Sequence, residues 1–254
     1  MAFFVPLRLM MGLEIMEKAI WKQATNLDFW QKYSPWYRQW MNHSHYHEGI
    51  VNFLTSVVTP KWRVLDIGAG NGVLSKPLAR SGCEVTAMEP SPAMRILLRE
   101  EMKREQAKAI SVNRRSWEEA SCEAFRDFDL ILACNSLHLC PLGFRSALDK
   151  VFAASSKRVM VVTEFFSPEI RIPVRYKKYR LEYGRIERVN NSFAYHTIEE
   201  AMAHWAANQG RRPDVREREE IKQKLVQVGD HLWMEDSALV GLFFWRLKMD
   251  GSCA

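Results

Sequence analysis

The chain has 254 residues, of which 47% are hydrophobic and 26% are charged. These proportions are those of ordinary globular proteins, so they exclude a wholly disordered chain, and the length suits one α/β domain with a substantial addition. The formal net charge of +6 permits an acidic or nucleic-acid partner but does not require one.

The beginning of the chain, residues 1–13, is apolar but contains Pro6 and Arg8 and has no charged leader before its hydrophobic run. It does not fit a signal peptide, and it is too short to span a bilayer. The five cysteines form no Cys-x-x-Cys pair, which favours free thiols in a reducing compartment. We expect a cytoplasmic protein without a membrane span, and no pattern indicates an oligomeric state.

The first 60 residues have a helical pattern rich in aromatic side chains, which predicts an N-terminal helical cap over residues 1–60. Aromatic residues recur at helical spacing over 29–40, and Pro35 predicts a break or a fresh helix start among them. Such a stripe is typical of core packing. It also suits a cap over a ligand in which Tyr33 and Tyr37 line a substrate pocket, and the two interpretations are compatible.

Three histidines, His43, His45 and His47, lie close together in this region. On a helix, His43 and His47 share a face while His45 points elsewhere, so the three cannot bind one metal ion together. Because no cysteine or carboxylate cluster accompanies them at ligand spacing, we predict no metal site.

From residue 61 to 254, short apolar runs alternate with amphipathic stretches, as in βα units on a parallel sheet. The strands expected from this alternation are 63–67, 84–88, 109–112, 129–134 and 158–163. The helices expected between and after them are 74–80, 92–108, 143–154 and 219–227. Two more strands, 231–234 and 238–247, are expected to form an antiparallel pair through a turn at 235–237.

The segment 164–218 interrupts this rhythm and predicts an insertion after the fifth strand. Within it, residues 171–188 carry seven basic and two acidic side chains, and Tyr176, Tyr179 and Tyr183 fall at helical spacing. The favoured interpretation is a solvated helical lid with one tyrosine face. Binding of an acidic small substrate and binding of RNA are the alternatives, because single-stranded nucleic acid binding uses basic and aromatic side chains together.

A glycine-rich turn, Asp66-Ile67-Gly68-Ala69-Gly70-Asn71-Gly72, joins the first expected strand to the helix expected at 74–80. Glycines let the backbone turn sharply and approach a ligand closely, and the helix N-terminus favours a carboxylate group. Asp66 is placed to receive an ammonium group. Val73 occupies the last glycine position of a dinucleotide fingerprint, and no P-loop lysine follows, so the turn fits neither motif. A glycine turn without a ligand is the alternative.

Glu89 ends the second expected strand. In open α/β sheets ligands lie across the carboxyl ends of the strands, and a carboxylate there accepts hydrogen bonds from both hydroxyls of a ribose. The alternative is a surface acid that precedes the turn at 90–92. Glu89 therefore indicates an adenosine-type ribose without identifying the cofactor.

Three segments together, 66–72, 89–94 and 128–138, resemble the class I S-adenosylmethionine-dependent methyltransferases. The similarity covers about residues 62–162 and the final strand. It implies a Rossmann-like, doubly wound α/β sheet of seven strands, mostly parallel with the last strand antiparallel. It also implies S-adenosylmethionine as cofactor, S-adenosylhomocysteine as product, and methyl transfer by in-line displacement from the sulfonium. The cofactor-binding residues that the resemblance implies are Asp66, Gly68, Ala69, Gly70, Glu89, Pro90, Trp117, Glu118 and Asn135.

Ser116, Trp117 and Glu118 follow the third expected strand, at the position that flanks the adenine in the family. Many members carry an acid where Ser116 stands, so the resemblance gives this side chain no adenine contact. Trp117 either covers the adenine face, a contact suited to an aromatic ring, or is a core tryptophan.

Asn135, Ser136 and His138 follow the fourth expected strand and are expected to face the crevice beside the cofactor. Ser136 and His138 are candidates for substrate binding. His138 is also the candidate catalytic base or orienting group, because histidine titrates near neutral pH, and a structural histidine is the alternative. The Asn/Asp-Pro-Pro-Tyr/Phe pattern of enzymes that methylate exocyclic base amines is absent, which disfavours such substrates.

These features predict a methyltransferase that acts on a small-molecule acceptor, with a cap at 1–60, a methyltransferase domain at 61–254 and a substrate-covering insertion at about 164–218. One alternative is an RNA or protein methyltransferase that uses the basic segment 171–188. The other is a non-catalytic S-adenosylmethionine-binding partner protein, since a fold does not fix its function.

Overall fold

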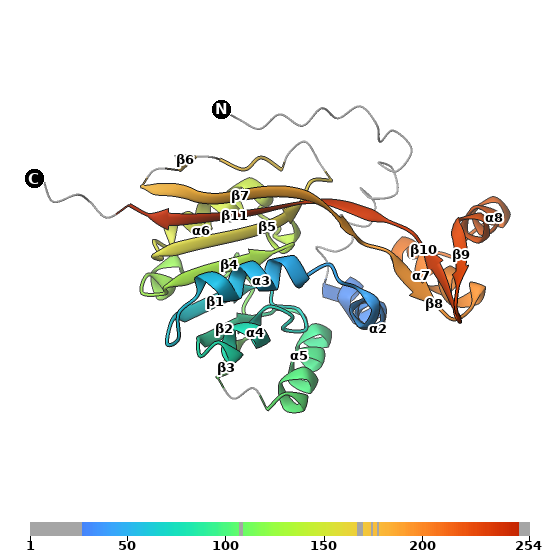
Figure 1. The fold of residues 1–254 in the computed structure, drawn as a ribbon, viewed down its shortest axis with the longest axis horizontal. Coiled ribbons are helices and arrows are strands. Elements are labelled where there is room, and N and C mark those ends of the chain that lie inside the picture. Colours follow the sequence, from blue (N-terminus) through green and yellow to red (C-terminus); the bar gives the residue numbers. More distant parts are fainter. Residues whose placement is uncertain (1–26, 107–108, 167–169, 174, 177, 249–254) are drawn as a thin grey trace, which may run out of the picture.

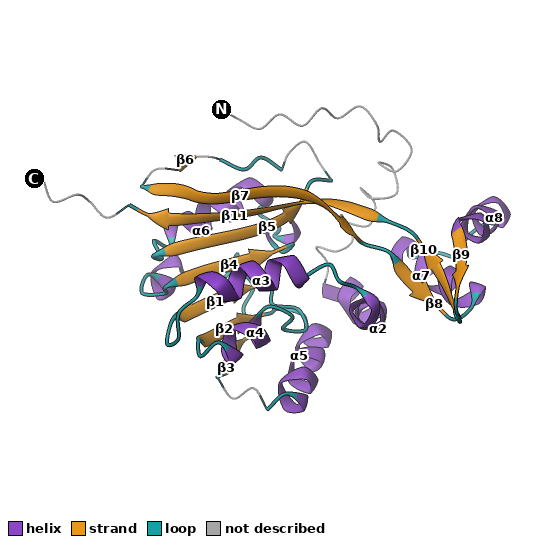
Figure 2. Ribbon diagram, viewed as in Figure 1, coloured by secondary structure: helices purple, strands orange, loops and turns teal. Residues whose placement is uncertain are grey.

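The described residues of the computed structural model are 27–106, 109–166, 170–173, 175–176 and 178–248. They form one large β-sheet with helices on both faces and a smaller three-stranded unit to one side (Figure 1, Figure 2). Residues 1–26 of the predicted cap lie outside the described residues. Within the described ranges, no helix is long and apolar enough to cross a membrane.

The large sheet has the strand order β3-β2-β1-β4-β5-β11-β7-β6. Its strands are β1 (Arg63–Ile67), β2 (Glu84–Met88), β3 (Ile110–Asn113), β4 (Leu130–Cys134), β5 (Arg158–Glu164), β6 (Arg175–Tyr176), β7 (Tyr179–Asn190) and β11 (Ser237–Leu247). β1 to β5 pair in parallel, whereas β11 runs antiparallel to both of its neighbours, β5 and β7. The seven strands other than β6 confirm the predicted seven-stranded sheet, in which the last strand of the chain, β11, is antiparallel. The two-residue strand β6 pairs with β7 at the edge of the sheet.

The central strands are apolar on both faces because helices cover both faces. In β1, Leu65 packs on the side of α6 (Phe144–Ala153), and Val64 packs on the side of α3 (Glu48–Val57) and α4 (Ser75–Arg80). Both side chains are completely buried. This packing holds the parallel strands in register and brings the carboxyl ends of β1, β2, β4 and β5 to one edge of the sheet.

Helix α5 (Pro92–Arg104) starts where the sequence supplies a cap. The Ser91 hydroxyl accepts a hydrogen bond from the Met94 backbone N–H at 3.3 Å, and Pro92 occupies the first turn, where its missing N–H costs nothing. Two short 3-10 helices, η1 (Cys122–Phe125) and η2 (Leu137–Leu139), precede and follow β4. The turn at 89–91 and η2 therefore both lie at strand ends.

Helix α2 (Leu27–His43) runs without interruption through Pro35, so the predicted break at that residue is wrong. A proline inside a helix removes one hydrogen bond and crowds the preceding turn. Here the two halves of the helix stay aligned because α2 packs against α5 and against β8 and α7 of the smaller unit. In contrast, α3 joins the main core, where Ile50 and Leu54 pack with Leu78 of α4.

The basic segment expected to be a helical lid is largely strand β7, so that prediction is wrong. Every residue of β11 from Ser237 to Leu247 pairs with β7. Tyr179 packs into the core on the α6 side while Tyr183 stacks on Phe53 on the other face. The two tyrosines are four residues apart and would share a face in a regular strand, but the register shifts between them, where Leu181 pairs with Trp245 and Tyr183 with Phe244. Pairing with an apolar strand far away in the sequence overrides the local helical spacing of the tyrosines.

The smaller unit consists of β8 (Phe193–Tyr195), α7 (Ile198–Gln209), α8 (Val215–Lys224), β9 (Leu225–Val228) and β10 (His231–Met234). β10 pairs with β8 and β9, whereas β11 belongs to the large sheet, so the predicted pair of the last two strands is wrong. The unit therefore connects β7 to β11, and these two long strands extend past the other strands of the large sheet to reach it (Figure 1).

Local signals explain the elements of the smaller unit. Helix α8 starts at a capping box made by Asp214 and Glu217, which is earlier than the expected start at 219. Its expected last residues, 225–227, instead form strand β9, because the turn at 229–230 with Gly229 at φ +62° folds this segment back onto β10.

Candidate functional site

The glycine-rich turn leaves β1 at the carboxyl edge of the sheet. Gly68 has φ +68°, and a Cβ atom there would lie 2.4 Å from the Cβ of Ser136. Gly72 has φ +80°, and its Cβ would lie 2.5 Å from Leu98 Cδ1. Both positions therefore require glycine for backbone conformation and for space. The Ser136 hydroxyl donates to the Ile67 carbonyl at 2.6 Å, which ties the end of β4 to the end of β1.

Asp66 is buried near the end of β1, with 2% of its surface exposed. Its carboxylate accepts a 2.6 Å hydrogen bond from the Ser75 hydroxyl at the start of α4. Burial raises the pKa of Asp66 to about 6 although the Ser75 hydrogen bond lowers it. A carboxylate so poorly solvated is well suited to receive an ammonium group.

Glu89 follows β2 directly and is buried, with 6% of its surface exposed. Its two carboxylate oxygens accept hydrogen bonds from the backbone N–H groups of Gly70 at 2.9 Å and Ser91 at 2.8 Å. Burial raises the pKa of this carboxyl, and the two backbone hydrogen bonds oppose the rise. Arg95 donates to the carbonyls of Glu89 and Pro90 at 2.9 and 2.6 Å, which fixes the turn.

Tyr37 of α2 reaches the glycine-rich turn. A Cβ atom on Gly70 would lie 3.7 Å from the Tyr37 hydroxyl. Burial raises the pKa of Tyr37, and the charges of Cys134, Glu89 and Asp66 raise it further. The hydroxyl is therefore neutral and lies close to both buried carboxylates, so the structure places Tyr37 beside the predicted cofactor residues.

Tyr33, the other tyrosine predicted to line a pocket, connects α2 to the smaller unit. Its hydroxyl lies 3.0 Å from Nε2 of His204, whose Nδ1 lies 2.7 Å from the hydroxyl of Tyr195. Burial lowers the pKa of His204 to about 3, so the ring is neutral. Burial also raises the pKa of Tyr33, and the charge of Glu164 adds to this effect.

The carboxyl ends of β4 and β5 share a hydrogen-bonded group. Asn135, with φ +48°, donates from Nδ2 to the Tyr46 hydroxyl at 2.6 Å and accepts from the Glu164 backbone N–H at 3.0 Å. The Tyr46 hydroxyl donates to Glu164 Oε1 at 2.8 Å. Our sequence interpretation included Asn135 but neither partner. Glu164 ends a strand and was detectable by the same rule as Glu89, whereas Tyr46 lies among histidines and gives no signal.

His138 lies on η2, beyond the end of β4. Its ring meets the ring of Phe166 edge to face, with centroids 4.9 Å apart. Burial lowers the pKa of His138 to about 3, so the imidazole is neutral. A neutral ring of such low pKa is better suited to orienting a substrate than to holding a proton.

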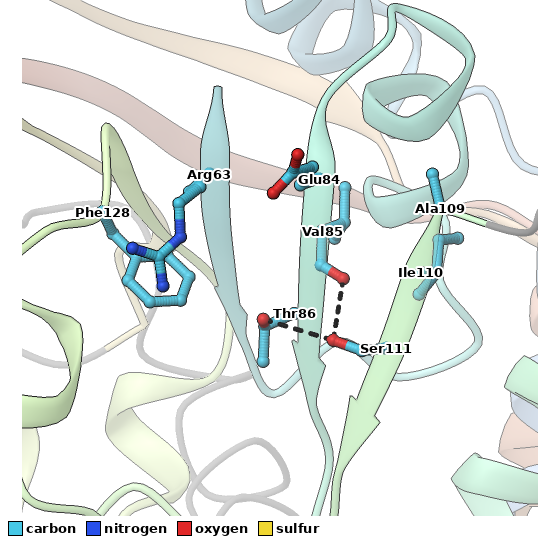
Figure 3. Close-up of a pocket in the computed structure, with 8 residues that line it drawn as sticks. All are labelled: Arg63, Glu84, Val85, Thr86, Ala109, Ile110, Ser111 and Phe128. Carbon is cyan, nitrogen blue, oxygen red and sulfur yellow. Dashed lines mark hydrogen bonds between the residues drawn. The ribbon is translucent and has the colours of Figure 1, made fainter. Parts of the chain in front are cut away.

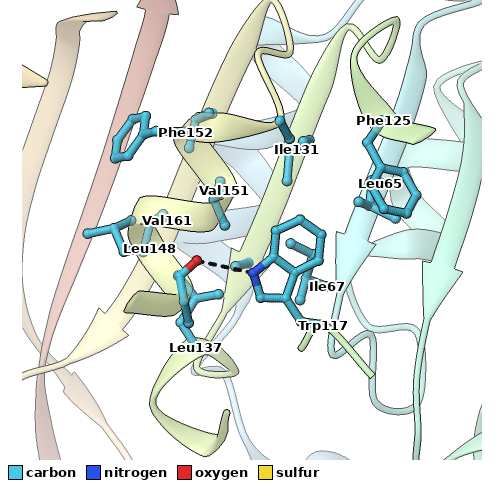
Figure 4. Packing of buried hydrophobic residues seen from close by; sticks show 14 of the residues in the cluster. Leu65, Ile67, Trp117, Phe125, Ile131, Leu137, Leu148, Val151, Phe152 and Val161 are labelled. Carbon is cyan, nitrogen blue, oxygen red and sulfur yellow. Dashed lines mark hydrogen bonds between the residues drawn. The ribbon is translucent and has the colours of Figure 1, made fainter. Parts of the chain in front are cut away.

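Trp117 lies inside the core between the sheet and α6 (Figure 4). Only 4% of it is exposed, and its Nε1–H donates to the Ala147 carbonyl at 3.1 Å. This packing favours the core interpretation over a ring that covers adenine. Glu118 next to it is partly exposed, and its carbonyl accepts from Lys150 Nζ at 2.8 Å.

The three neighbouring histidines have separate environments. The His43 ring lies 5.1 Å from that of His231, and His45 Nδ1 lies 2.6 Å from the carboxylate of Glu48. His47 is buried, and burial lowers its pKa to about 4. In the described part of the chain, no group of three or more His, Cys, Asp or Glu side chains is arranged to hold a metal ion.

A surface hollow lies at the opposite, amino-terminal edge of the sheet (Figure 3). It is lined by Arg63, Glu84, Val85, Thr86, Ala109, Ile110, Ser111 and Phe128. The Arg63 guanidinium lies over the Phe128 ring, 4.7 Å from its centroid. Ligands of open parallel sheets bind at the carboxyl ends of the strands, so this hollow is not the candidate site.

Comparisons with known proteins agree with this geometry. Residues 64–157 match the family model described as a methyltransferase domain. No curated protein matches the chain.

Among solved structures, a candidate methyltransferase from Bacillus halodurans is 12% identical with a TM-score of 0.55, over 78% of this chain and 99% of that one. A candidate RNA methyltransferase from Pyrococcus horikoshii is 14% identical with a TM-score of 0.52, over 83% and 90%. Coclaurine N-methyltransferase, solved with N-methylheliamine and S-adenosylhomocysteine, is 12% identical with a TM-score of 0.50, over 79% and 72%. These likenesses establish a common fold. The family-model match identifies residues 64–157 as a methyltransferase domain.

Proposed function

We propose that this chain binds S-adenosylmethionine at the ends of β1 and β2 and transfers its methyl group to a small-molecule acceptor near the ends of β4 and β5. The observation that carries the proposal is the meeting of Asp66, the glycine-rich turn and Glu89 at one edge of the sheet, beneath Tyr37. The bound cofactor would supply an electrophilic methyl group on a sulfonium.

The residues present fit this cofactor. Buried Asp66 suits the ammonium of its methionine part, and the turn at Gly68 and Gly70 admits backbone contact with a ligand. Glu89, whose oxygens now accept from backbone N–H groups, suits the ribose hydroxyls. The proposed cofactor set also includes Ala69 and Pro90, which lie in the two turns, and Asn135, which lies at the end of β4. Glu118, which follows β3, belongs to the set as well.

The acceptor side favours a small molecule. Tyr33, Asn135, Glu164 and His138 come from four separate elements, and α2 and the smaller unit are joined there through His204. Aligning an acceptor with the methyl group is the main catalytic task, and side chains held on several rigid elements suit it. The Ser136 hydroxyl already donates a hydrogen bond to the Ile67 carbonyl, so its role in substrate binding stays a prediction.

The RNA alternative receives little support from the basic segment. Tyr176 and Tyr179 are buried in the core and Tyr183 stacks on Phe53, so these rings form no common platform for bases. Two arginines of β7 also pair with acids, Arg180 with Glu182 at 3.1 Å and Arg185 with Glu187.

The proposal is tested by calorimetric titration with S-adenosylmethionine and S-adenosylhomocysteine. Wild type is expected to bind both saturably, and Glu89→Ala to weaken binding about tenfold or more, because a buried carboxylate partner is lost. Glu84→Ala, at the other end of the same strand, is the matched control and should leave affinity unchanged. Absence of binding by folded wild type, or equal losses in the two variants, would contradict the proposed site.

Methyl transfer separates an enzyme from a non-catalytic binding protein. With labelled S-adenosylmethionine and a metabolite panel, label is expected to appear in an acceptor. His138→Ala should lower this turnover without weakening cofactor binding, because the ring lies beyond the cofactor residues. Saturable cofactor binding with no transfer to any acceptor would favour the non-catalytic alternative.

A further inference from the structure

A second surface hollow lies where β5 begins and the antiparallel strand β11 ends, and its volume is about 410 Å³. These strand ends belong to the amino-terminal edge of the large sheet. The proposed cofactor residues lie at the opposite edge, so the hollow is separate from the cofactor site. Its volume is within the range of small-molecule sites, which is about 300–1,000 Å³.

Four aromatic side chains from four segments line the hollow: Phe53 of α3, Trp62 before β1, Tyr183 of β7 and Phe244 of β11. Phe53 stacks on Tyr183 with ring centroids 4.4 Å apart. It also meets Phe244 edge to face, with centroids 5.9 Å apart. These rings hold one another in place, and such a wall suits the planar apolar part of a ligand.

Arg158, the first residue of β5, brings a positive charge into this hollow. Its Cζ atom lies 4.0 Å from the centroid of the Trp62 ring. In the described parts of the chain, no carboxylate pairs with the Arg158 guanidinium and no group accepts a hydrogen bond from it. The contact with Trp62 uses one face of the guanidinium and leaves its in-plane N–H donors available.

Glu182 lines the same hollow but does not neutralise Arg158. Its Oε1 lies 3.1 Å from Nη2 of Arg180, and its Oε2 lies 3.0 Å from Nε of Arg246. Burial lowers the pKa of Arg158, and the charge of Arg246 lowers it further. Two arginines therefore lie close enough to repel each other, while both oxygens of this carboxylate are engaged by other arginines.

Asp129, the other acid whose charge acts on Arg158, is engaged as well. Its Oδ1 accepts from Lys157 Nζ at 2.7 Å, and its Oδ2 accepts from the Arg63 backbone N–H at 3.0 Å. Arg158 is thus a partly exposed cation in an aromatic hollow without an acid partner of its own. A partly desolvated charge gains more from a partner of opposite sign than a fully exposed one does.

We infer that this hollow binds a small aromatic carboxylate, with the carboxylate on Arg158 and the planar ring against the aromatic wall. A guanidinium matches a carboxylate through two parallel hydrogen bonds. A cationic ligand would be repelled by Arg158 and Arg246, and a neutral one would leave Arg158 without a partner. This site goes beyond the proposed function, because it lies at the edge of the sheet opposite the cofactor residues.

The test uses three probes of matched shape: indole-3-acetate, indole-3-ethanol and tryptamine. Each is titrated calorimetrically at low salt into the 254-residue chain without cofactor. The acetate is expected to bind about tenfold or more tightly than the alcohol, with the amine weakest, because only the acetate forms a charge-assisted pair with a guanidinium. Arg158→Gln should abolish the preference for the anion.

Two further variants keep the test decisive. Arg63→Gln is the matched control, because Arg63 also begins a strand at this edge and its guanidinium also lies over a ring, that of Phe128. This variant should retain the preference for the anion. Arg158→Lys keeps the charge but loses the planar fork, so it should retain a smaller preference even if Arg158→Gln does not fold.

Every outcome decides the inference. Absence of indole-3-acetate binding by folded wild type, or equal affinity for the three probes, contradicts it. Unchanged anion preference in Arg158→Gln also contradicts it. A loss of preference in Arg63→Gln alone would place the anion in the other hollow (Figure 3) and overturn the assignment to Arg158. Because no cofactor is present in the titration, these results do not depend on the proposed function.

Discussion

Asp66 is deeply buried and carries a negative charge, and in the protein without a bound cofactor this combination lowers the stability of the folded state. The carboxyl has a pKa of about 6 in the folded chain against an ordinary value of 3.8, because burial disfavours its charged form. The folded state therefore binds more protons than the unfolded state between these values. Stability falls as pH rises from about 4 to about 6, and the loss persists at higher pH.

We predict that Asp66→Asn raises the free energy of unfolding at pH 8 by about 2–3 kcal/mol, since the amide is neutral and still accepts the Ser75 hydrogen bond. At pH 4 the two proteins should be nearly equal. Urea denaturation at both pH values measures this difference. The same variant should lose cofactor binding, so a stabler protein that still binds S-adenosylmethionine would contradict the assigned role.

At the scale of single elements, Pro35 inside α2 provides a direct test of what holds the N-terminal helix in place. Pro35→Ala restores a backbone hydrogen bond and relieves crowding, and it should raise the free energy of unfolding by about 1–3 kcal/mol. Lys32→Ala, at an exposed position of the same helix, is the control and should change stability by less than about 0.5 kcal/mol. Thermal and urea denaturation measure both. Destabilisation by Pro35→Ala would contradict this prediction.

The elements that the sequence predicts well are those with strong local patterns. The strands β1, β2, β4 and β5 and the helices α4, α5 and α6 fall close to their expected ranges, because buried parallel strands are continuous apolar runs. β7 was predicted as a helix because its partner β11 is distant in sequence, and β10 was paired with β11 because residues 225–227 were assigned to a helix and not to strand β9. The tyrosines of β7 happen to fall at helical spacing, and only pairing with β11 decides between helix and strand.

The same distinction applies to the candidate site. Asp66, the glycine-rich turn and Glu89 were detectable because the cofactor side depends on short motifs at strand ends. Tyr46 and His204 were not, because their functional neighbours come from β5 and from α2. Trp117 looks like a ligand contact in sequence, yet its hydrogen bond to the Ala147 carbonyl places it in the core.

For the whole molecule, three buried neutral histidines predict acid sensitivity. Burial lowers the pKa of His47 to about 4 and those of His138 and His204 to about 3, against an ordinary value of 6.5. Below pH 6.5 the unfolded chain binds protons that the folded chain does not, so these groups reduce stability as pH falls toward 3. Asp66 has the opposite effect on stability. Between about pH 6 and 4 its carboxyl binds up to one more proton in the folded chain than in the unfolded chain, so it raises stability as pH falls.

We therefore predict a fall in the free energy of unfolding from pH 7 to pH 5, with each histidine contributing a slope of up to about 1.4 kcal/mol per pH unit. His204→Gln should reduce this slope by up to about 1.4 kcal/mol per pH unit, because the unfolded chain then binds about one proton fewer. His45→Gln is the control, because the His45 side chain is 79% exposed. Urea denaturation across this range measures the slope, and a slope unaffected by His204→Gln would exclude His204 as a contributor.

The smaller unit leaves and re-enters the large sheet at adjacent positions. Asn190 of β7 pairs directly with Ser237 of β11, and the Asn191 N–H donates to the Asp236 carbonyl at 3.0 Å. Everything between these residues could thus be replaced by a tight hairpin turn without separating the two strands. In evolutionary terms, we expect the region that contacts α2 through His204 to vary in length and sequence more readily than β1, β2 and their turns.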